Sequence, residues 1–364
     1  MSKKILVINP GSTSTKLAIY EDQTKIVQEN FVHESSKIAE FKNLIDQVPF
    51  RTAIIDEFLN SNNISLQSLS AVVGRGGLVV GLKGGGYTVN DDLATALSSD
   101  KYSSPHASNL GGLIARSYAE KVSEITGNTI PSYIYDAVTG GELSEVASIT
   151  GFKEITRTSA CHLLNSHAMS VKYAQSIGKT YNDLQLIVAH LGGGISISAH
   201  TNGKLTDSIG DDEFHFSPER SGNTSLLKVL DLIYNNNISK AELKKMIRGS
   251  GGMFAHLGTN SCIEIEKMIE GGDKYAKLIY EAQAQQVAKS IGGLSVVQKG
   301  QTDAIILTGG IAHSKMLTSM ITDYVNSIAK VVVLPGENEM EALAFGALRL
   351  INNEETPHTY KLPQ

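Results

Sequence analysis

One segment near the start of this 364-residue chain combines small residues with groups that could bind phosphate. It reads Asn9-Pro10-Gly11-Ser12-Thr13-Ser14-Thr15-Lys16 and lies between two apolar runs. Backbone amides in a turn of small residues, hydroxyl groups and a lysine charge all bind phosphate oxygens. The segment lacks the GK[ST] ending and the following helix of a Walker loop, and an ordinary β-hairpin is the alternative interpretation.

Two further glycine segments follow apolar runs in the second half of the chain. His190-Leu191-Gly192-Gly193-Gly194 has more glycines than a two-residue hairpin needs, which predicts a second phosphate loop, with a simple glycine-rich bend as the alternative. Thr308-Gly309-Gly310-Ile311 follows the apolar run 303–307. Ligands of open α/β sheets bind beyond the carboxyl ends of strands, so a flat base or ribose could lie there, although any Gly-Gly turn would look the same.

Charged and imidazole side chains at the ends of predicted elements could act on such a ligand. Arg75 in Gly-Arg-Gly-Gly and Arg220 in Ser-Pro-Glu-Arg-Ser-Gly are framed by glycines, and their planar forks suit carboxylate or phosphoryl oxygens. Asp136 ends a predicted strand and Glu339 opens the last predicted helix, where a carboxylate can hold Mg²⁺. His162 could donate to a transferring phosphoryl oxygen. The alternatives are a surface salt bridge for each arginine, and capping or core packing for the others.

Composition excludes several classes of function. The net charge of −5 gives no basic excess for nucleic acid or an anionic membrane. Two cysteines are too few for a disulfide framework and favour a reducing compartment. The other histidines have no metal-ligand spacing such as HExxH. The N-terminus begins a predicted strand without a signal-like segment, and no apolar run approaches membrane-spanning length, so we expect a cytoplasmic protein.

Apolar periodicity predicts strands that alternate with helices, which is typical of an α/β fold. The runs 4–9 and 16–20 flank the first glycine segment, and the runs 186–190 and 195–199 flank the second. Superposing Gly11 on Gly192 puts Asn9 opposite His190, a weak internal repeat that suggests a duplicated α/β domain with a cleft between the halves. The other predicted strands are 71–74, 132–135, 303–307 and 331–334, and the predicted helices are 50–59, 167–177, 226–234, 275–294 and 339–350.

Together and in this order, the three glycine segments resemble those of the acetate/butyrate kinase branch of the actin-like ATPase superfamily. Four finer motifs resemble the butyrate kinases within that branch. They are Gly74-Arg75-Gly76-Gly77, Pro105-His106-Ala107-Ser108-Asn109-Leu110-Gly111, Phe216-Ser217-Pro218-Glu219-Arg220-Ser221-Gly222 and Leu257-Gly258-Thr259-Asn260. The resemblance covers essentially the whole chain.

The resemblance implies two ribonuclease H-like domains, 1–148 with 340–364 and 149–339, that bind ATP and an acid in the cleft between them. The last helix would pack back on the N-terminal domain. By the family pattern, the γ-phosphate would be surrounded by Asn9, Ser12, Ser14 and Lys16, and the phosphate loop would consist of His190, Gly192, Gly193 and Gly194. Adenosine would be bordered by Gly309, Gly310 and Ile311, and the acyl carboxylate and phosphoryl group would be clamped by Arg75 and Arg220. The acid and imidazole of the site would be Asp136 and His162, and the carboxylate near Mg²⁺ would be Glu339, with Asn9 as a second candidate at the metal.

Three positions depart from the family pattern. His167 lies one residue further along than the second histidine of acetate kinases, and no role is assigned to it. Asn223 stands where butyrate kinases often have glycine, and His256 where tyrosine is common. These departures concern the size of the pocket and leave the expected reaction unchanged.

The expected reaction is the reversible transfer of the γ-phosphoryl group of ATP to a short-chain carboxylate, butyrate first, by a homodimer or larger homo-oligomer. Acetate, propionate or a branched-chain acid is the alternative substrate. An actin- or chaperone-like ATPase and a non-catalytic ligand sensor are alternatives of other classes, but the former leaves the arginine motifs unexplained. The latter has no helix-turn-helix or basic patch to favour it.

Overall fold

The computed structural model describes residues 2–363, which divide into two compact units. The first unit comprises the chain up to Gly140 together with the segment from Asn338 onward, and the second comprises Gly141–Glu337. The resemblance placed the boundaries at 148/149 and 339/340. The division in the structure puts Glu339 in the N-terminal unit, with Asn9 and Arg75.

The N-terminal unit is built on a seven-stranded sheet of order β12-β5-β6-β4-β1-β2-β3. The strand β1 pairs in antiparallel fashion with β2 and in parallel with β4, which in turn pairs in parallel with β6. The apolar runs of β1 and β4 are buried because both lie inside the sheet. The strands are β1 (Lys4–Pro10), β2 (Ser14–Glu21), β3 (Thr24–Val32), β4 (Ala71–Arg75), β5 (Gly86–Thr88), β6 (Ser132–Tyr135) and β12 (His358–Thr359).

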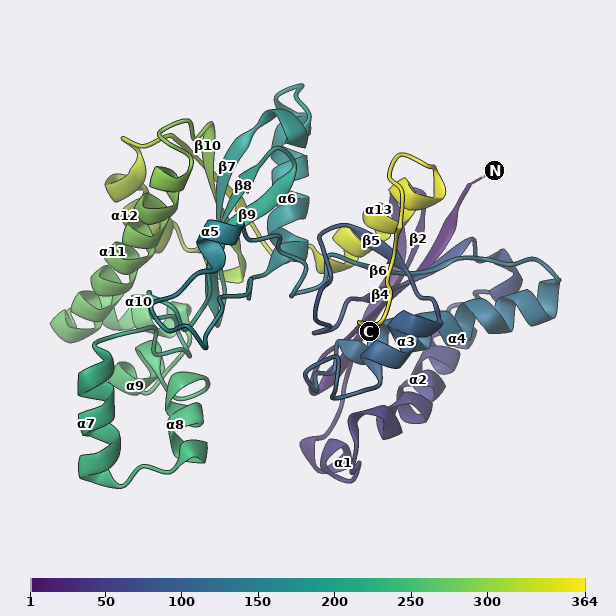
Figure 1. Cartoon of the computed structure of the whole chain (residues 1–364), viewed down its shortest axis with the longest axis horizontal. Helices are drawn as coiled ribbons and strands as arrows, with labels where there is room; N and C mark the ends of the chain where they lie inside the picture. The colour runs from purple at the N-terminus through teal and green to yellow at the C-terminus, as the bar shows by residue number, and fades with distance from the viewer. Residues whose placement is uncertain (1, 364) are drawn as a thin grey trace. The chain divides into compact units, whose positions relative to one another are not determined.

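Helices cover both faces of this sheet (Figure 1). Apolar side chains of β1 and β2, including Leu6 and Ile19, form one core cluster with α2 (Val48–Ser61) and α4 (Asn109–Thr126). Tyr20 points to the other face, since successive strand residues alternate, and its ring contacts Phe345 of α13 (Glu339–Ile351). The last helix thus packs on the N-terminal sheet. The unit also contains α1 (Ser35–Ala39) and α3 (Asp91–Leu97).

The C-terminal unit has a five-stranded sheet of order β11-β10-β7-β8-β9. Its strands are β7 (Gln185–Leu191), β8 (Ile195–Thr201), β9 (Lys204–Ile209), β10 (Ala304–Gly309) and β11 (Lys330–Pro335). The helix α6 (Leu163–Ser176) covers one face, whereas α11 (Lys274–Val297) and α12 (Lys315–Val325) contribute to the apolar cluster on the other. The remaining helices are α5 (Glu145–Ser148), α7 (Leu226–Asn236), α8 (Lys240–Ile247), α9 (Gly252–Leu257) and α10 (Cys262–Glu270).

The two units share one strand topology, which confirms the predicted duplicated α/β fold. The order β3-β2-β1-β4-β6 of the first unit repeats as β9-β8-β7-β10-β11 in the second, with the same antiparallel and parallel pairings. The two glycine hairpins match in register, because Asn9 lies opposite Lys16 and His190 lies opposite Ser196, one pair before the turn in each case.

Most predicted elements are present within a few residues of the predicted ends. The largest error among them is the helix predicted at 167–177, which begins four residues earlier, at Leu163. The two longest helices for which no bounds were predicted are α4 and α12. In α4 the pair Gly111-Gly112 interrupts the apolar stripe, but a Cβ on Gly74 of β4 would lie 2.1 Å from the carbonyl oxygen of Gly111. The helix therefore packs against the strand at a distance that only glycine permits.

The helix α7 exposes an apolar surface. None of its residues is buried, and Figure 1 shows α7 and α8 projecting from the rest of their unit. Leu226, Leu227, Leu230 and Tyr234 are among its exposed side chains. No helix within residues 2–363 has the length and apolar character needed to cross a bilayer.

We expect acid to destabilise the protein through His200 of β8. This ring is fully buried between the hydroxyls of Tyr181 and Ser198, and burial, followed by the charge of His167, lowers its pKa from 6.5 to about 3. In the unfolded chain the ring binds a proton below pH 6.5, whereas in the folded protein it does so only near pH 3. The free energy of unfolding is therefore unaffected by this group above pH 6.5, and it falls by up to about 1.4 kcal/mol for each pH unit between 6.5 and 3.

Urea unfolding at pH 7, 6 and 5 measures this effect. The variant His200→Gln, which has no titrating ring, should lose less stability over this range than the unmodified protein. Equal losses in the two proteins would contradict the assignment to His200.

Candidate functional site

The carboxyl ends of three strands in the N-terminal unit bring predicted site residues to one edge of the sheet. Asn9 is the last residue but one of β1, Arg75 ends β4, and Asp136 directly follows β6. Because β1, β4 and β6 are parallel, their carboxyl ends meet at the same edge. This is the edge at which α/β sheets bind their ligands.

Glu339 joins Asn9 and Arg75. Its Oε2 accepts a hydrogen bond of 2.8 Å from Asn9 Nδ2, and its Oε1 lies 2.5 Å from a terminal nitrogen of Arg75. The first residue of α13 therefore meets the ends of β1 and β4, although Asn9 and Glu339 are 330 positions apart in the sequence. The carboxylate neutralises the guanidinium and fixes its position at the edge of the sheet.

The turn between β1 and β2 carries the remaining predicted residues of this unit. Lys16 lies opposite Asn9 in the antiparallel pair, so the two side chains share a face of the sheet. Lys16 forms no ion pair within residues 2–363. Ser12 is exposed and Ser14 is half-buried. A lysine without a carboxylate partner beside a turn of hydroxyl residues suits an anionic ligand.

Asp136 is buried and holds the neighbouring loop. Its Oδ1 accepts a hydrogen bond of 2.8 Å from the amide of Gly85, and its own amide donates to the Gly85 carbonyl at 3.1 Å. Asp136 also has a positive φ of 42°, which is uncommon for a residue with a side chain. These bonds place Asp136 at the strand edge and order the Gly84-Gly85-Gly86 turn.

His106 was not predicted as a site residue, although its motif was noted. His106 is exposed, but nearby protein atoms remove part of the water around its ring. This desolvation, followed by the charge of Arg75, lowers the pKa of His106. The Nδ1 atom lies 2.7 Å from the hydroxyl of Ser108. We call Asn9, Ser12, Ser14, Lys16, Arg75, Asp136 and Glu339 the N-terminal group, and His106 lies beside it.

In the C-terminal unit, the arginine motif packs against the glycine turn between β7 and β8. The hydroxyl of Ser217 donates to the carbonyl of Gly193 at 2.7 Å, and the amide of Glu219 donates to the same carbonyl at 3.2 Å. The motif is also fixed from behind, because the amides of Met253 and Phe254 bind the carbonyls of Ser217 and Pro218.

Two carboxylates hold the Arg220 side chain in this position. Its Nε lies 3.2 Å from Asp211 Oδ2, and a terminal nitrogen lies 3.2 Å from Glu219 Oε2. The same carboxylates contact the glycines of the turn, since a Cβ on Gly194 would lie 2.9 Å from Asp211 Oδ2 and one on Gly193 would lie 3.5 Å from the Glu219 carboxyl. Arg220 therefore lies beside the glycine turn, and a side chain at Gly194 would crowd the Asp211 carboxylate that holds it.

The predicted histidines of this unit stack on each other. The rings of His162 and His190 are 3.9 Å apart between centroids and almost parallel, at 6°. His162 lies at the N-terminus of α6, and its Nδ1 lies 2.8 Å from the hydroxyl of Ser196 on β8. His190 is the last residue but one of β7, and only Leu191 separates it from the glycines. The stack brings the start of α6 to the glycine turn.

Asn165, which was not predicted, fixes the ring of His190. Its Nδ2 lies 3.0 Å from His190 Nδ1 and 3.1 Å from the hydroxyl of Thr308, while its buried Oδ1 has no partner within residues 2–363. With Nδ1 accepting this hydrogen bond, a neutral His190 carries its proton on Nε2. The Nε2 atom lies 3.7 Å from a Glu337 oxygen.

For the expected phosphoryl transfer to a short-chain carboxylate, we expect Asn165→Ala to lower kcat/KM about tenfold. The variant loses hydrogen bonds worth roughly 1 kcal/mol each, and the ring of His190 is then free to move. Steady-state kinetics over a range of pH measure the effect. Ser170→Ala, at another buried polar position further along α6, is the control and should retain activity. Equal activity of the two variants would contradict the positioning role.

The third glycine segment lies beside the second. Thr308 of β10 is opposite His190 of β7 in a parallel pair, and a Cβ on Gly309 would lie only 2.3 Å from the carbonyl oxygen of Leu191. Gly309 also has a φ of 91°, so both space and conformation require glycine. Gly310 is exposed and begins a short 3₁₀ turn that includes Ile311.

We call the unit's predicted residues the C-terminal group: His162, His190, Gly192, Gly193, Gly194, Arg220, Gly309, Gly310 and Ile311. Contacts and strand pairing place all of them around the carboxyl ends of β7 and β10. Such a surface of glycine backbone, imidazole and guanidinium can hold phosphate groups.

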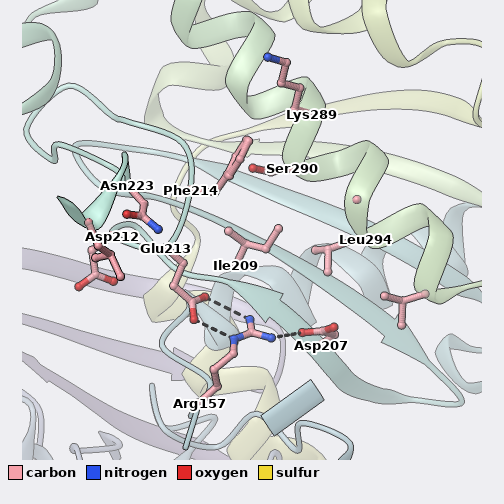
Figure 2. Close-up of a pocket in the computed structure, with 13 residues that line it drawn as sticks. Arg157, Asp207, Ile209, Asp212, Glu213, Phe214, Asn223, Lys289, Ser290 and Leu294 are labelled. Carbon is pink, nitrogen blue, oxygen red and sulfur yellow. Dashed lines mark hydrogen bonds and ion pairs between the residues drawn. The ribbon is translucent and has the colours of Figure 1, made fainter. Parts of the chain in front are cut away.

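A pocket of about 710 Å³ lies in the same unit but contains no predicted site residue (Figure 2). Arg157 pairs with Glu213 at 2.9 Å and with Asp207 at 3.3 Å on one side of it, and Lys289, Ser290 and Leu294 of α11 line the other. The cluster around Arg157 orders the chain that leads from β9 to Asp211, the partner of Arg220.

Comparison with known proteins agrees with this fold. The structure superposes on the acetate kinase of Porphyromonas gingivalis with a TM-score of 0.78 at 17% identity, covering 96% of this chain and all of that one. For a propionate kinase from Francisella tularensis the TM-score is 0.70 at 17% identity, with 94% and 98% covered. A ROK family protein from Streptococcus pneumoniae gives 0.52 at 11% identity, with 97% and 100% covered.

The fold is therefore that of the actin-like ATPases, with two mixed sheets of the same topology. The sequence model of the Acetokinase family matches residues 156–361, which is more than half of the chain. The chain belongs to the acetokinase family and is a carboxylate kinase, an enzyme that transfers a phosphoryl group to a carboxyl group.

Proposed function

We propose that this enzyme transfers the γ-phosphoryl group of ATP to butyrate, reversibly, forming butyryl phosphate and ADP. The observation that carries the proposal is the position of Arg220 against the Gly192-Gly193-Gly194 turn. A guanidinium next to a phosphate loop can neutralise the charge that develops on a transferring phosphoryl group.

The proposed roles follow the two groups of residues. In the C-terminal group, His190 and the three glycines hold the β- and γ-phosphates, and Gly309, Gly310 and Ile311 border adenosine. In the N-terminal group, Asn9, Ser12, Ser14 and Lys16 bind the γ-phosphoryl group, and Arg75 binds the carboxylate. His162 donates to a phosphoryl oxygen, in support of Arg220.

The carboxylate needs no general base. Its pKa is roughly 4, so it is already an anion at neutral pH. The barrier is the repulsion between this anion and the phosphates, which arginine, lysine and imidazole groups reduce by electrostatic stabilisation. Asp136 therefore acts as an orienting group, which agrees with its hydrogen bonds to Gly85.

The N-terminal group fits Mg²⁺, with Glu339 and Asn9 as the residues that would hold it. Within residues 2–363 no cluster of three histidine, cysteine or acidic side chains could form a complete metal cage. Mg²⁺ accepts such a site because it usually retains waters and binds one or two carboxylates together with substrate phosphates. When bound, the ion would neutralise charge on the β- and γ-phosphates.

The preference for butyrate rests on the four finer sequence motifs. In the structure, the Phe216–Gly222 motif holds Arg220, and the Gly74–Gly77 motif holds Arg75. The Leu257–Asn260 motif contributes Asn260, whose Nδ2 donates at 2.6 Å to Glu219, a partner of Arg220. Three of the four motifs thus contain one of the two arginines that the proposal assigns to the acid and the phosphoryl group, or contact a partner of one.

Trapping of the acyl phosphate with hydroxylamine, across straight-chain and branched acids from acetate to hexanoate, tests the proposal. We expect the highest kcat/KM with butyrate. A maximum with acetate, propionate or isobutyrate would replace butyrate but keep the reaction. ADP release that does not depend on a carboxylate would instead indicate an actin- or chaperone-like ATPase, and binding without turnover a ligand sensor.

We also propose a homodimer or larger oligomer in the cytoplasm. The exposed apolar side chains of α7 suit a subunit interface, and the two cysteines of the chain are too few for a disulfide framework, which suits a reducing compartment. Sedimentation velocity measures the oligomer, and a monomer at micromolar concentration would contradict this part of the proposal.

A further inference from the structure

A buried arginine lies beneath the turn between β1 and β2. Arg51 belongs to α2, and its side chain is 0% exposed, on the same face of the helix as Ile55 and Phe58. Burial lowers its pKa to about 10, which still leaves it charged at neutral pH. Buried charges are normally paired with an opposite charge, because desolvation is costly.

Arg51 has no such partner. Within residues 2–363, no carboxylate lies within 4 Å of its guanidinium. All five N–H donors instead bind neutral oxygens. They reach the carbonyls of Gly11 and Ser14 at 2.8 Å each, the hydroxyl of Thr15 at 2.8 Å, and Gln47 Oε1 at 3.0 and 3.2 Å.

The hydroxyl of Thr15 carries this network to His33. The Thr15 oxygen that accepts from Arg51 also lies 2.8 Å from His33 Nε2. Burial and then the charge of Arg51 lower the pKa of His33, which favours the neutral ring. The guanidinium charge is thus not balanced by its hydrogen-bonding neighbours.

The network also orients the turn. Arg51 binds the carbonyls of Gly11 and Ser14, and the carbonyl of Thr13 accepts from the amide of His33 at 2.8 Å. At the exposed tip, the amides of Ser12 and Thr13 have no acceptor within residues 2–363. Carbonyls bound by the protein and amides left free at the tip form the arrangement of an anion-binding turn.

We propose that Arg51 is a positioning residue for a phosphoryl group bound at the tip of this turn, and that its buried charge is balanced by that group. The inference deepens the proposed function, on which the identity of the phosphoryl donor rests. It assigns to Arg51 two effects: to hold the carbonyls of Gly11 and Ser14 inward, and to raise the positive potential at the amides of Ser12 and Thr13.

The test compares the variants Arg51→Met and Arg51→Lys with the control Tyr118→Phe, all in the full chain. Tyr118 of α4 is also fully buried, and its hydroxyl donates at 3.0 Å to the carbonyl of Thr52 in α2. Its removal therefore loosens α2 without touching the turn. Thermal unfolding is measured with inorganic phosphate, with MgATP and with matched sodium chloride, and KM for ATP is measured separately.

We expect phosphate and MgATP to raise the Tm of the unmodified protein and of Tyr118→Phe by similar amounts. Arg51→Met should lose most of the increase with either anion, and its KM for ATP should rise roughly tenfold while kcat changes less. Arg51→Lys, which keeps the charge but not the planar fork, should recover part of both. If the increase in Tm depends on Arg51 with MgATP alone, the turn binds the nucleotide. If it depends on Arg51 with both ligands, the turn binds phosphate groups in general.

The proposal is overturned if Arg51→Met and Arg51→Lys keep the full increase in Tm and the KM of the control, whatever their basal stability. If Arg51→Met does not fold, the lysine variant decides by the same readouts. Failure of the proposed function has a different signature. In that case the unmodified protein would form no acyl phosphate with any acid, while the dependence of phosphate binding on Arg51 would remain.

Discussion

Replacing Arg220 by alanine is expected to lower kcat about a thousandfold, as removal of a guanidinium that stabilises a phosphoryl-transfer transition state typically does. Affinity for ATP should change little, because the glycines and His190 that are proposed to bind its phosphates remain. Steady-state kinetics with butyrate and MgATP, combined with nucleotide binding measured by calorimetry, separate the two effects.

The structure indicates that this substitution acts locally. Arg220 is about one quarter exposed, at 24%, and its partners Asp211 and Glu219 are both partly accessible to water. The backbone of its motif is held by Gly193, Met253 and Phe254, and none of these bonds uses the arginine side chain. Asp211 also keeps its ion pair of 2.9 Å with Arg248 when Arg220 is removed, so the Asp211 carboxylate is not left without a cation and the variant should remain folded.

Arg248 provides a matched control. It contacts the same Asp211 at 2.9 Å, and Asp212 at 3.1 Å, but its side chain is 50% exposed and no role is proposed for it. Arg248→Ala should therefore keep kcat within a few-fold of the unmodified enzyme. Turnover of Arg220→Ala at the level of Arg248→Ala would refute the assignment of Arg220.

The parts of the fold that were predicted correctly depend on local sequence. The hairpins on either side of the first two glycine segments follow from apolar runs, because a buried strand must be apolar and a tight turn needs small residues. The match between Asn9 and His190 was visible for the same reason, since the topology repeats in the two units.

The elements that were missed depend on long-range packing. The glycines of α4 disfavour a helix locally, and the close approach of Gly111 to Gly74 is not visible in either segment alone. The helix bounds 167–177 leave out the first turn of α6, which long-range contacts hold in place: the ring of His162, directly before α6, stacks on His190 of another element.

In the candidate site too, local sequence predicted the residues themselves, whereas long-range packing determines their partners. Glycine spacing and the framed arginines located both groups of residues, but the partners that hold them come from distant segments. Glu339 meets Asn9 and Arg75 across more than 260 positions, and Asn165 reaches His190 from a helix. Arg51 had one signal, an arginine on the apolar stripe of the predicted helix 50–59, in line with Ile55 and Phe58.

The second large effect is expected for Arg75. Arg75→Met should lower kcat about a thousandfold, because the proposal assigns this guanidinium to the carboxylate beside the transferring phosphoryl group. The same variant should also lose stability, since it leaves the Glu339 carboxylate, which is only 13% exposed, without its cation. The cost of such an unpaired group is roughly 1 to 3 kcal/mol.

A double variant separates these two losses. In Arg75→Met/Glu339→Gln the uncompensated charge is gone, and a neutral pair at a mostly buried site is often as stable as the ion pair it replaces. We therefore expect urea unfolding to show stability close to that of the unmodified protein, whereas the loss of kcat persists. Recovery of activity together with stability would mean that Arg75 only holds Glu339 in place, and that the acid is bound by another residue.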